Sequence, residues 1–243
     1  MTDQHAEIEF RSDVTVELVR SSAHDADVLF AARVSTKGEQ SLEDVDADAS
    51  RSQGLINYLI KERHGSPFEH NSMTFYVRAP IFVFREFMRH RVGYSYNEES
   101  GRYRELQPTF YLPGPDRKLQ QEGKPGRYDF VEGTPEQFKL VDTATRRVCI
   151  EAYTAYKRML EAGVAREVAR MVLPLNIFSS MYVTLNARSM MNFLSLRTKH
   201  EESTFPSYPQ REIEMVAERM EAEWAKLMPL AHAAFEANGR VAP

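Results

Sequence analysis

The sequence predicts an α+β protein, a helix-rich single domain with a small mixed or antiparallel sheet. Most apolar residues recur at helical spacing, and the few strand-like segments do not alternate regularly with helices as they would in a doubly wound sheet. A chain of 243 residues can bury the core of one large domain. The domain is expected to span residues 1–243, with residues 1–13 and 239–243 as frayed arms.

The expected sheet is built from three segments rich in β-branched and aromatic residues. These segments are residues 14–19, 73–78 and 178–185. Between the second and third, residues 107–133 contain four of the twelve prolines, which predicts a long surface excursion that covers a site or reaches a neighbouring subunit.

Helices are expected over most of the remaining chain, where apolar side chains form one face. The predicted ranges are 23–32, 55–60, 81 to a stop near Gly93, 135–162, 166–173, 187–196, 210–228 and 230–237. The last turn of the helix that begins at residue 81 would carry Arg85, Arg89 and His90. The polar segment 37–51 is expected to be a loop.

Composition narrows the class of protein. The net charge of −4 gives no general attraction to nucleic acid or to an anionic membrane. No run approaches the roughly eighteen apolar residues of a membrane span, and the N-terminal residues lack a secretory pattern, so a cytoplasmic protein is expected. The single cysteine, Cys149, excludes an internal disulfide and a cysteine-based metal site. Its helical neighbours are apolar, which predicts a small buried side chain and not a nucleophile.

Residues 89–103 concentrate polar chemistry in one short segment. Arg-His-Arg at 89–91 and Ser-Gly-Arg at 100–102 bracket several tyrosines and two carboxylates. Arginine suits bidentate capture of phosphate or carboxylate, and residues 95–102 have turn-forming composition. We therefore interpret the segment as an anion site, against the simpler alternative of a solvated loop with internal salt bridges.

Two further clusters also gather polar and charged residues that could bind a ligand. His64, Ser66, Glu69 and His70 lie within seven residues, but the two histidines lack the i, i+4 spacing of helical zinc pairs, so no metal is predicted. In the third cluster, Arg188 and Asn192 share a helix face.

The third cluster also includes Arg170, Asn186 and Arg197. A face of asparagine and arginine suits a planar heterocycle rich in hydrogen-bonding groups, whereas the simpler alternative is helix capping by Asn186 plus surface arginines. Phosphate-loop and GxGxxG glycine patterns are missing, so a nucleotide would be held by side chains from several segments.

Taken together, these motifs resemble those of the flavin-dependent thymidylate synthases. The family signature is Arg-His-Arg, seven residues and then Ser; here eight residues separate Arg91 from Ser100, a one-residue insertion at Val92-Gly93-Tyr94. The Ser-Tyr-Asn-Glu-x-Ser-Gly-Arg-Tyr core follows. Other segments with familial motifs, in the family's order, are 31–35, 64–70, 166–170, 173–176 and 186–197. The resemblance covers roughly residues 14–228 and implies the fold of that family.

The resemblance implies two sets of binding residues. FAD would be contacted by His64, Ser66, Arg89, His90, Arg91, Glu98, Asn186, Arg188 and Asn192. Deoxyuridylate (dUMP) would be held by Glu86, Arg89, Glu98, Glu99, Ser100, Gly101, Arg102, Arg170 and Arg197. Glu86 stands where many relatives have glutamine. Either His200 or Tyr208 would take the place of a histidine that usually follows the equivalent of Arg197.

The same resemblance implies reductive methylation of dUMP to dTMP. NADPH would reduce FAD, 5,10-methylenetetrahydrofolate would supply the carbon, and the enzyme would be a homotetramer. Arg197 would be the catalytic residue, because a guanidinium beside uracil can stabilise the charge that a thiolate generates in other thymidylate synthases. The alternative is a non-catalytic single-stranded nucleic-acid-binding module, with arginines on phosphates and tyrosines stacking on bases. The acidic net charge counts against this alternative.

Overall fold

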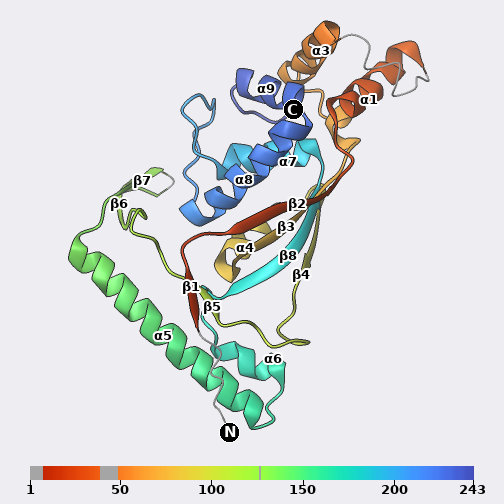
Figure 1. The fold of residues 1–243 in the computed structure, drawn as a ribbon. Coiled ribbons are helices and arrows are strands. Elements are labelled where there is room, and N and C mark those ends of the chain that lie inside the picture. Colours follow the sequence, from red (N-terminus) through yellow and green to blue (C-terminus); the bar gives the residue numbers. More distant parts are fainter. Residues whose placement is uncertain (1–7, 39–48, 126) are drawn as a thin grey trace. The chain divides into compact units, whose positions relative to one another are not determined.

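The computed structural model describes residues 8–38, 49–125 and 127–243 (Figure 1). Its helices and small sheets make it an α+β protein, as predicted. The chain forms two compact units, each assembled from separate segments. The first unit comprises Met1–Val14, Arg78–Phe87 and Glu98–Met181, and the second comprises Thr15–Val77, Met88–Asn97 and Tyr182–Pro243. That the whole chain behaves as one domain stays a prediction.

The main sheet has four strands in the order β2, β3, β8, β4. The three expected strands are confirmed as β2 (Thr15–Ser21), β3 (Met73–Pro80) and β8 (Phe178–Leu185). In β3, every second side chain from Met73 to Ala79 is buried, as expected for a strand with one face on the core. The hydroxyl groups of Thr74 and Thr184 lie 2.9 Å apart and join β3 to β8.

The fourth strand, β4 (Tyr94–Glu98), was not predicted. The prediction of a turn from residue 95 is therefore wrong as far as Glu98. Tyr94 and Tyr96 point to the same side and stack with ring centroids 5.6 Å apart, while Ser95 and Asn97 are exposed. This alternation of aromatic and small polar residues is typical of a strand.

Helix α4 covers only Ile81–Phe87, so the prediction that its last turn carries Arg89 and His90 is wrong. The chain turns after Phe87, and the Tyr96 hydroxyl donates to the His90 carbonyl at 2.7 Å. That carbonyl is therefore used by β4 and not by a continuing helix.

The other helices of the second unit agree with the predicted ranges, with shifted ends. They are α1 (Asp25–Lys37), α3 (Ala49–Lys61), α7 (Ala187–Arg197), α8 (Arg211–Leu227) and α9 (Pro229–Ala237). The 3₁₀ turn η1 (Ser66–Glu69) lies outside the predicted helical ranges. The loop expected at 37–51 falls largely on residues 39–48, which lie outside the described residues. At its two ends the prediction is wrong, because Lys37 belongs to α1 and residues 49–51 belong to α3.

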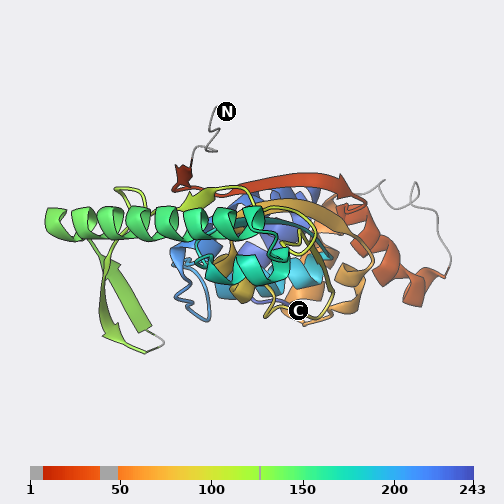
Figure 2. The same ribbon diagram turned by 90° about the horizontal axis from the view of Figure 1, so that it is seen from below.

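The first unit is organised by α5 (Pro135–Glu161), a single long helix that Figure 2 shows along its whole length. Thr134 begins it with a capping box in which Gln137 is the partner. Tyr153, Tyr156 and Cys149 pack from this helix against Phe110 and Ile177. α6 (Arg166–Ala169) and the 3₁₀ turn η2 (Arg170–Val172) follow, which confirms the helical segment predicted at residues 166–173.

The excursion at 107–133 has its own secondary structure. β5 (Thr109–Tyr111) pairs in parallel with β1 (Glu9–Arg11), and β6 (Gln120–Lys124) forms an antiparallel hairpin with β7 (Arg127–Val131). β1 lies within an expected frayed arm, so that prediction is wrong for these residues. It is also wrong at the other end, because Arg240 and Ala242 are only 4% and 7% exposed.

Candidate functional site

The second unit contains a hollow of about 630 Å³, a volume typical of small-molecule sites. It is lined by cationic, amide and imidazole side chains, together with small residues such as Gly93 and Ser189. The lining residues are Arg63, Glu69, His90, Arg91, Val92, Gly93, Tyr94, Asn186, Arg188, Ser189, Asn192, Ala242 and Pro243. We call this the main hollow.

One wall of the main hollow depends on the close approach of Gly93 to α7. Gly93 has φ of +73°, and a Cβ at this position would collide with the Ser189 hydroxyl. Ser189 Oγ donates to the Val92 carbonyl at 2.9 Å, and the Tyr94 hydroxyl donates to the Ser189 carbonyl at 2.8 Å. The residues inserted relative to the family signature therefore form specific contacts with the helix.

The start of α7 places the amide groups. Asn186 is the N-cap, and its Oδ1 accepts from the backbone N–H of Ser189 at 2.9 Å. The backbone N–H of Ala187 donates to Asn71 Oδ1 at 2.9 Å, so the helix start is fixed from a second element. Asn192, one turn further, donates to the Arg188 carbonyl at 3.2 Å. Capping by Asn186 is thus present, and the side chain still lines the main hollow.

Arg188 lines the main hollow and is held there by two contacts. Its Nε donates to the Pro243 carbonyl at 2.8 Å, and its Nη1 pairs with Glu69 at 2.5 Å. Gly65 permits this position, because a Cβ there would lie 2.4 Å from Arg188 Nε. A bound anion would meet a guanidinium whose direction is already set.

His90, which lines the main hollow, is hydrogen-bonded to the guanidinium of Arg197. Arg197 Nε donates to His90 Nε2 at 3.1 Å, and Phe193 packs edge-on against the imidazole with centroids 5.0 Å apart. Burial lowers the pKa of His90, and the Arg197 charge lowers it further, to about 4. His90 is therefore neutral at pH 7, with its proton on Nδ1 and Nε2 as the acceptor.

The first unit gathers a separate group of predicted residues. Glu98 accepts from the Ser179 hydroxyl at 2.7 Å, and the Glu99 backbone N–H donates to the Ser180 carbonyl at 2.9 Å. Desolvation raises the pKa of Glu98, partly offset by the Ser179 hydrogen bond. The aliphatic part of Arg170 lies against Gly101.

Three other residues of the predicted substrate set, Glu86, Ser100 and Arg102, lie in the first unit. The Ser100 hydroxyl accepts from the backbone N–H of Arg102 at 3.3 Å. Arg102 is exposed and pairs with Glu167 at 2.7 Å. Glu86 is half-buried on α4.

The predicted residues thus fall into distinct groups. Of the predicted FAD residues, the main hollow collects His90, Arg91, Asn186, Arg188 and Asn192. Four others, His64, Ser66, Arg89 and Glu98, do not line the hollow as the structure describes it. His64 instead stacks on Tyr58 at 5.9 Å. The sequence analysis assigned no binding role to Arg63, Ser189 or Pro243. Arg63 directly precedes the motif at 64–70, Ser189 lies within the motif at 186–197, and Pro243 lies outside every motif.

His200 and Tyr208 both line a second hollow, of about 570 Å³, formed by residues 199–201, 206–208 and Glu214. His200 Nε2 lies 3.6 Å from Glu236, and Lys199 Nζ lies 5.9 Å from the Tyr208 ring centroid. Which of the two replaces the family histidine stays a prediction. Among the described residues, no helix is both long and apolar enough to cross a membrane.

Comparison with known proteins links this arrangement to one family. The family described as "Thymidylate synthase complementing protein" matches residues 17–230. A flavin-dependent thymidylate synthase of Streptomyces coelicolor is 70% identical over the full length of both chains, and one of Tropheryma whipplei (strain TW08/27) is 60% identical over 96% of this chain and 97% of its own.

A solved structure is also similar along nearly the whole chain. It is the UMP/dUMP methylase PolB of Streptomyces cacaoi, bound with 5-bromo-dUMP. The identity is 56%, the TM-score is 0.91, and the match covers 97% of this chain and 100% of that one.

The Arg197–His90 contact can be tested by titration. Arg197→Gln removes the neighbouring charge but not the burial, so the pKa of His90 should rise from about 4 toward its ordinary 6.5. NMR of ¹³C-labelled histidine would follow the imidazole, with His90→Gln to assign the signal. The control is Arg219→Gln on the exposed side of α8. An unchanged His90 titration in Arg197→Gln would show that the two groups do not interact.

Proposed function

The chain belongs to the family of flavin-dependent thymidylate synthases, and we propose that it is a methyltransferase that converts dUMP to dTMP by reductive methylation. The observation that carries this proposal is identity along the full length to proteins of that name, together with a hollow lined by residues of the family motifs. The neighbouring structure is a dUMP methylase bound with a dUMP analogue. The alternative of a nucleic-acid-binding module is not favoured by these relatives.

The main hollow has the donor set that FAD requires. Arg63, Arg91 and Arg188 offer guanidinium groups to a pyrophosphate, and Asn186 and Asn192 offer amides to a heterocycle. We propose that His64, Ser66, Arg89, His90 and Glu98 complete the FAD site. Bound FAD would supply the hydride that completes the methyl group, after reduction by NADPH, and 5,10-methylenetetrahydrofolate would supply the carbon.

We assign dUMP to a second polar set, which shares Arg89 and Glu98 with the FAD set. This set comprises Glu86, Arg89, Glu98, Glu99, Ser100, Gly101, Arg102, Arg170 and Arg197. Backbone around Gly101 and the guanidinium groups of Arg102 and Arg170 suit a nucleotide phosphate. Arg102 would exchange its present partner, Glu167, for the phosphate.

Arg197 is the proposed catalytic residue. Methyl transfer to uracil requires electron density at C5, and a guanidinium fixed beside the ring stabilises the negative charge that develops there. Neutral His90 suits this role, because it orients Arg197 through Nε without neutralising the guanidinium. The only thiol, on Cys149, is 1% exposed, so it is not available for addition to the ring.

We further propose that the protein acts in the cytoplasm as a homotetramer. Small molecules (dUMP, folate and NADPH) and other copies of the same chain are the proposed partners. The proposed dUMP residues come from several separate segments of the chain.

The function can be tested on purified protein. Absorption near 450 nm should reveal bound flavin, and incubation with dUMP, methylenetetrahydrofolate and NADPH should yield dTMP. Colourless protein that retards a single-stranded oligonucleotide and makes no dTMP would instead support the nucleic-acid-binding alternative.

Arg197→Lys separates binding from chemistry. Lysine keeps the positive charge but lacks the planar fork that can address two ring atoms. We expect FAD content and NADPH oxidation to be retained, while dTMP formation falls by roughly two to three orders of magnitude. Measuring NADPH oxidation and dTMP separately, with Arg219→Lys as the control, distinguishes the two effects. Near-normal dTMP output would remove Arg197 from catalysis.

Cys149→Ala tests the absence of thiol chemistry. Burial raises the pKa of the thiol, and Asn176 Nδ2 approaches Sγ at 3.2 Å but also donates to the Tyr111 carbonyl at 2.8 Å. We expect unchanged dTMP formation and a free energy of unfolding lower by about 1 kcal/mol, the scale of a small core deletion. Urea unfolding and turnover assays measure the two quantities. A folded variant that contains flavin but makes no dTMP would contradict the mechanism.

A further inference from the structure

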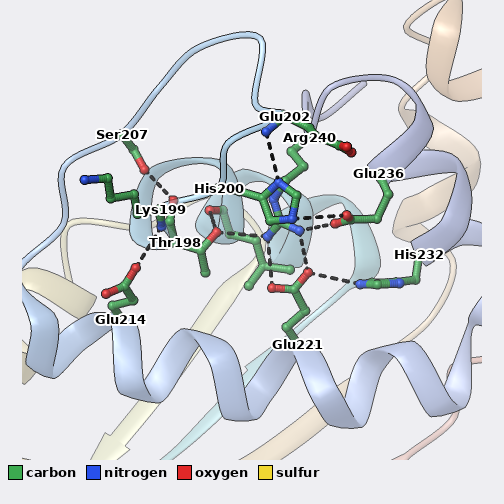
Figure 3. Close-up of polar contacts among 11 residues, drawn as sticks. Thr198, Lys199, His200, Glu202, Ser207, Glu214, Glu221, His232, Glu236 and Arg240 are labelled. Carbon is green, nitrogen blue, oxygen red and sulfur yellow. Dashed lines mark hydrogen bonds and ion pairs between the residues drawn. The ribbon is translucent and has the colours of Figure 1, made fainter.

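A buried arginine, Arg240, lies at the centre of a polar network next to the C-terminal end of α7 (Figure 3). Only 3% of its side chain is exposed. Its two Nη atoms reach both oxygens of Glu221, at 2.7 and 2.9 Å, and Nη1 also contacts Glu236. Phe235 packs under the guanidinium, with its ring centroid 5.0 Å from Cζ. Such a bidentate, stacked guanidinium has a fixed position and plane.

Hydrogen bonds to cationic and imidazole groups keep Glu221 ionised beside Arg240. Burial alone would raise the pKa of Glu221, but hydrogen bonds from His232 and Arg240 outweigh it and lower the pKa to about 2. Glu221, His232 and Glu236 bring ligand-type atoms within 4.8 Å of one another, as a metal site would. The two carboxylates already hold a cation, the guanidinium of Arg240, so we assign no metal there.

The network reaches α7 through one hydroxyl group. Arg240 Nη2 donates to Thr198 Oγ1 at 2.9 Å, and Thr198 Oγ1 donates to the Leu194 carbonyl at 2.7 Å. The backbone N–H of Thr198 reaches the same carbonyl at 3.1 Å, and the Thr198 carbonyl accepts from the Ser207 hydroxyl. Thr198 is 6% exposed. It is the C-cap of α7, and the preceding residue is Arg197.

We propose that Arg240 is a positioning residue for catalysis, which fixes Arg197 through Thr198. The buried guanidinium holds the Thr198 hydroxyl, Thr198 fixes the last turn of α7, and that turn directs Arg197 toward His90. This inference rests on the proposed role of Arg197. It assigns a function to a residue outside both hollows and outside the motifs that define the family resemblance.

A purely structural role would make different predictions. If Arg240 only stabilised the packing of α8 and α9, removing the Thr198 hydroxyl would cost some stability and leave turnover unchanged. If it positions Arg197, the same change should act on kcat and leave substrate KM and flavin content nearly constant. A displacement of about 1 Å at a reacting group costs roughly 100-fold in rate, so a smaller loosening should cost about tenfold or more.

Thr198→Val tests the link while keeping the side-chain shape and the carboxylate partners of Arg240. We expect kcat for dTMP formation to fall by about tenfold to hundredfold, with KM for dUMP and flavin content within about twofold of the original protein. The control is Thr154→Val on α5, which removes a hydroxyl that donates to the carbonyl four residues earlier at 2.8 Å. The control should leave kcat unchanged.

A double-variant cycle tests whether Arg240 acts through Thr198. In an Arg240→Lys background, Thr198→Val should lower kcat by less than about twofold, because the connection is already lost. Independent losses that multiply would contradict the proposal. If Arg240→Lys does not fold, Thr198→Val still tests the step from Thr198 to Arg197, because a normal kcat in that variant overturns the proposal.

The His90 titration supplies a readout without turnover. Loosening of Arg197 in Thr198→Val should move the pKa of His90 upward from about 4, and Thr154→Val should not. A normal kcat or an unshifted His90 titration in Thr198→Val would overturn the inference. Failure of the original protein to form dTMP would overturn the proposed function, whereas the titration would still test the structural link.

Discussion

The position of α7 depends on side-chain hydrogen bonds at both of its ends. At the start, Asn186 caps the helix, and Asn71 holds the backbone N–H of Ala187. At the end, Thr198 is fixed by Arg240 and by the Leu194 carbonyl. A helix end leaves backbone groups unsatisfied, so the residues that satisfy them also determine where the helix points. One end of this helix forms the main hollow and the other presents Arg197.

Much of the secondary structure could be predicted from the sequence, because apolar periodicity records which face of a segment is buried. The prediction succeeded for α5, whose pattern is long, and for β8. It failed at β4, where Tyr94 and Tyr96 alternate with small polar residues over only five positions. The prediction gave more weight to the turn-forming composition than to that short alternation. In the structure, pairing within the sheet and the contact of Tyr94 with Ser189 favour a strand. Local composition does not reveal such tertiary partners.

The types of residue in the candidate site could be predicted from the sequence, but the contacts between them could not. Recognised motifs pointed to His90, Arg188 and Asn192, which the main hollow brings together. No pattern in the sequence indicated that the Pro243 carbonyl accepts from Arg188, or that Arg240 reaches Thr198 across 42 residues of chain. Contacts between distant segments are set by the packing of several helices, which periodicity alone does not specify.

Three arginines of the second unit differ in how easily they can exchange their partners. Arg188 pairs with Glu69 at a partly exposed position, where an ion pair contributes little and an incoming anion can compete for the guanidinium. Arg240 is almost fully buried, and removing either partner would leave an uncompensated charge, so it cannot exchange partners in the same way. Arg197 is intermediate, since neutral His90 directs it without cancelling its charge. A guanidinium that stabilises charge developing on a substrate acts best from a fixed position. The neutral imidazole of His90 and the fixed end of α7 both restrain the direction of Arg197.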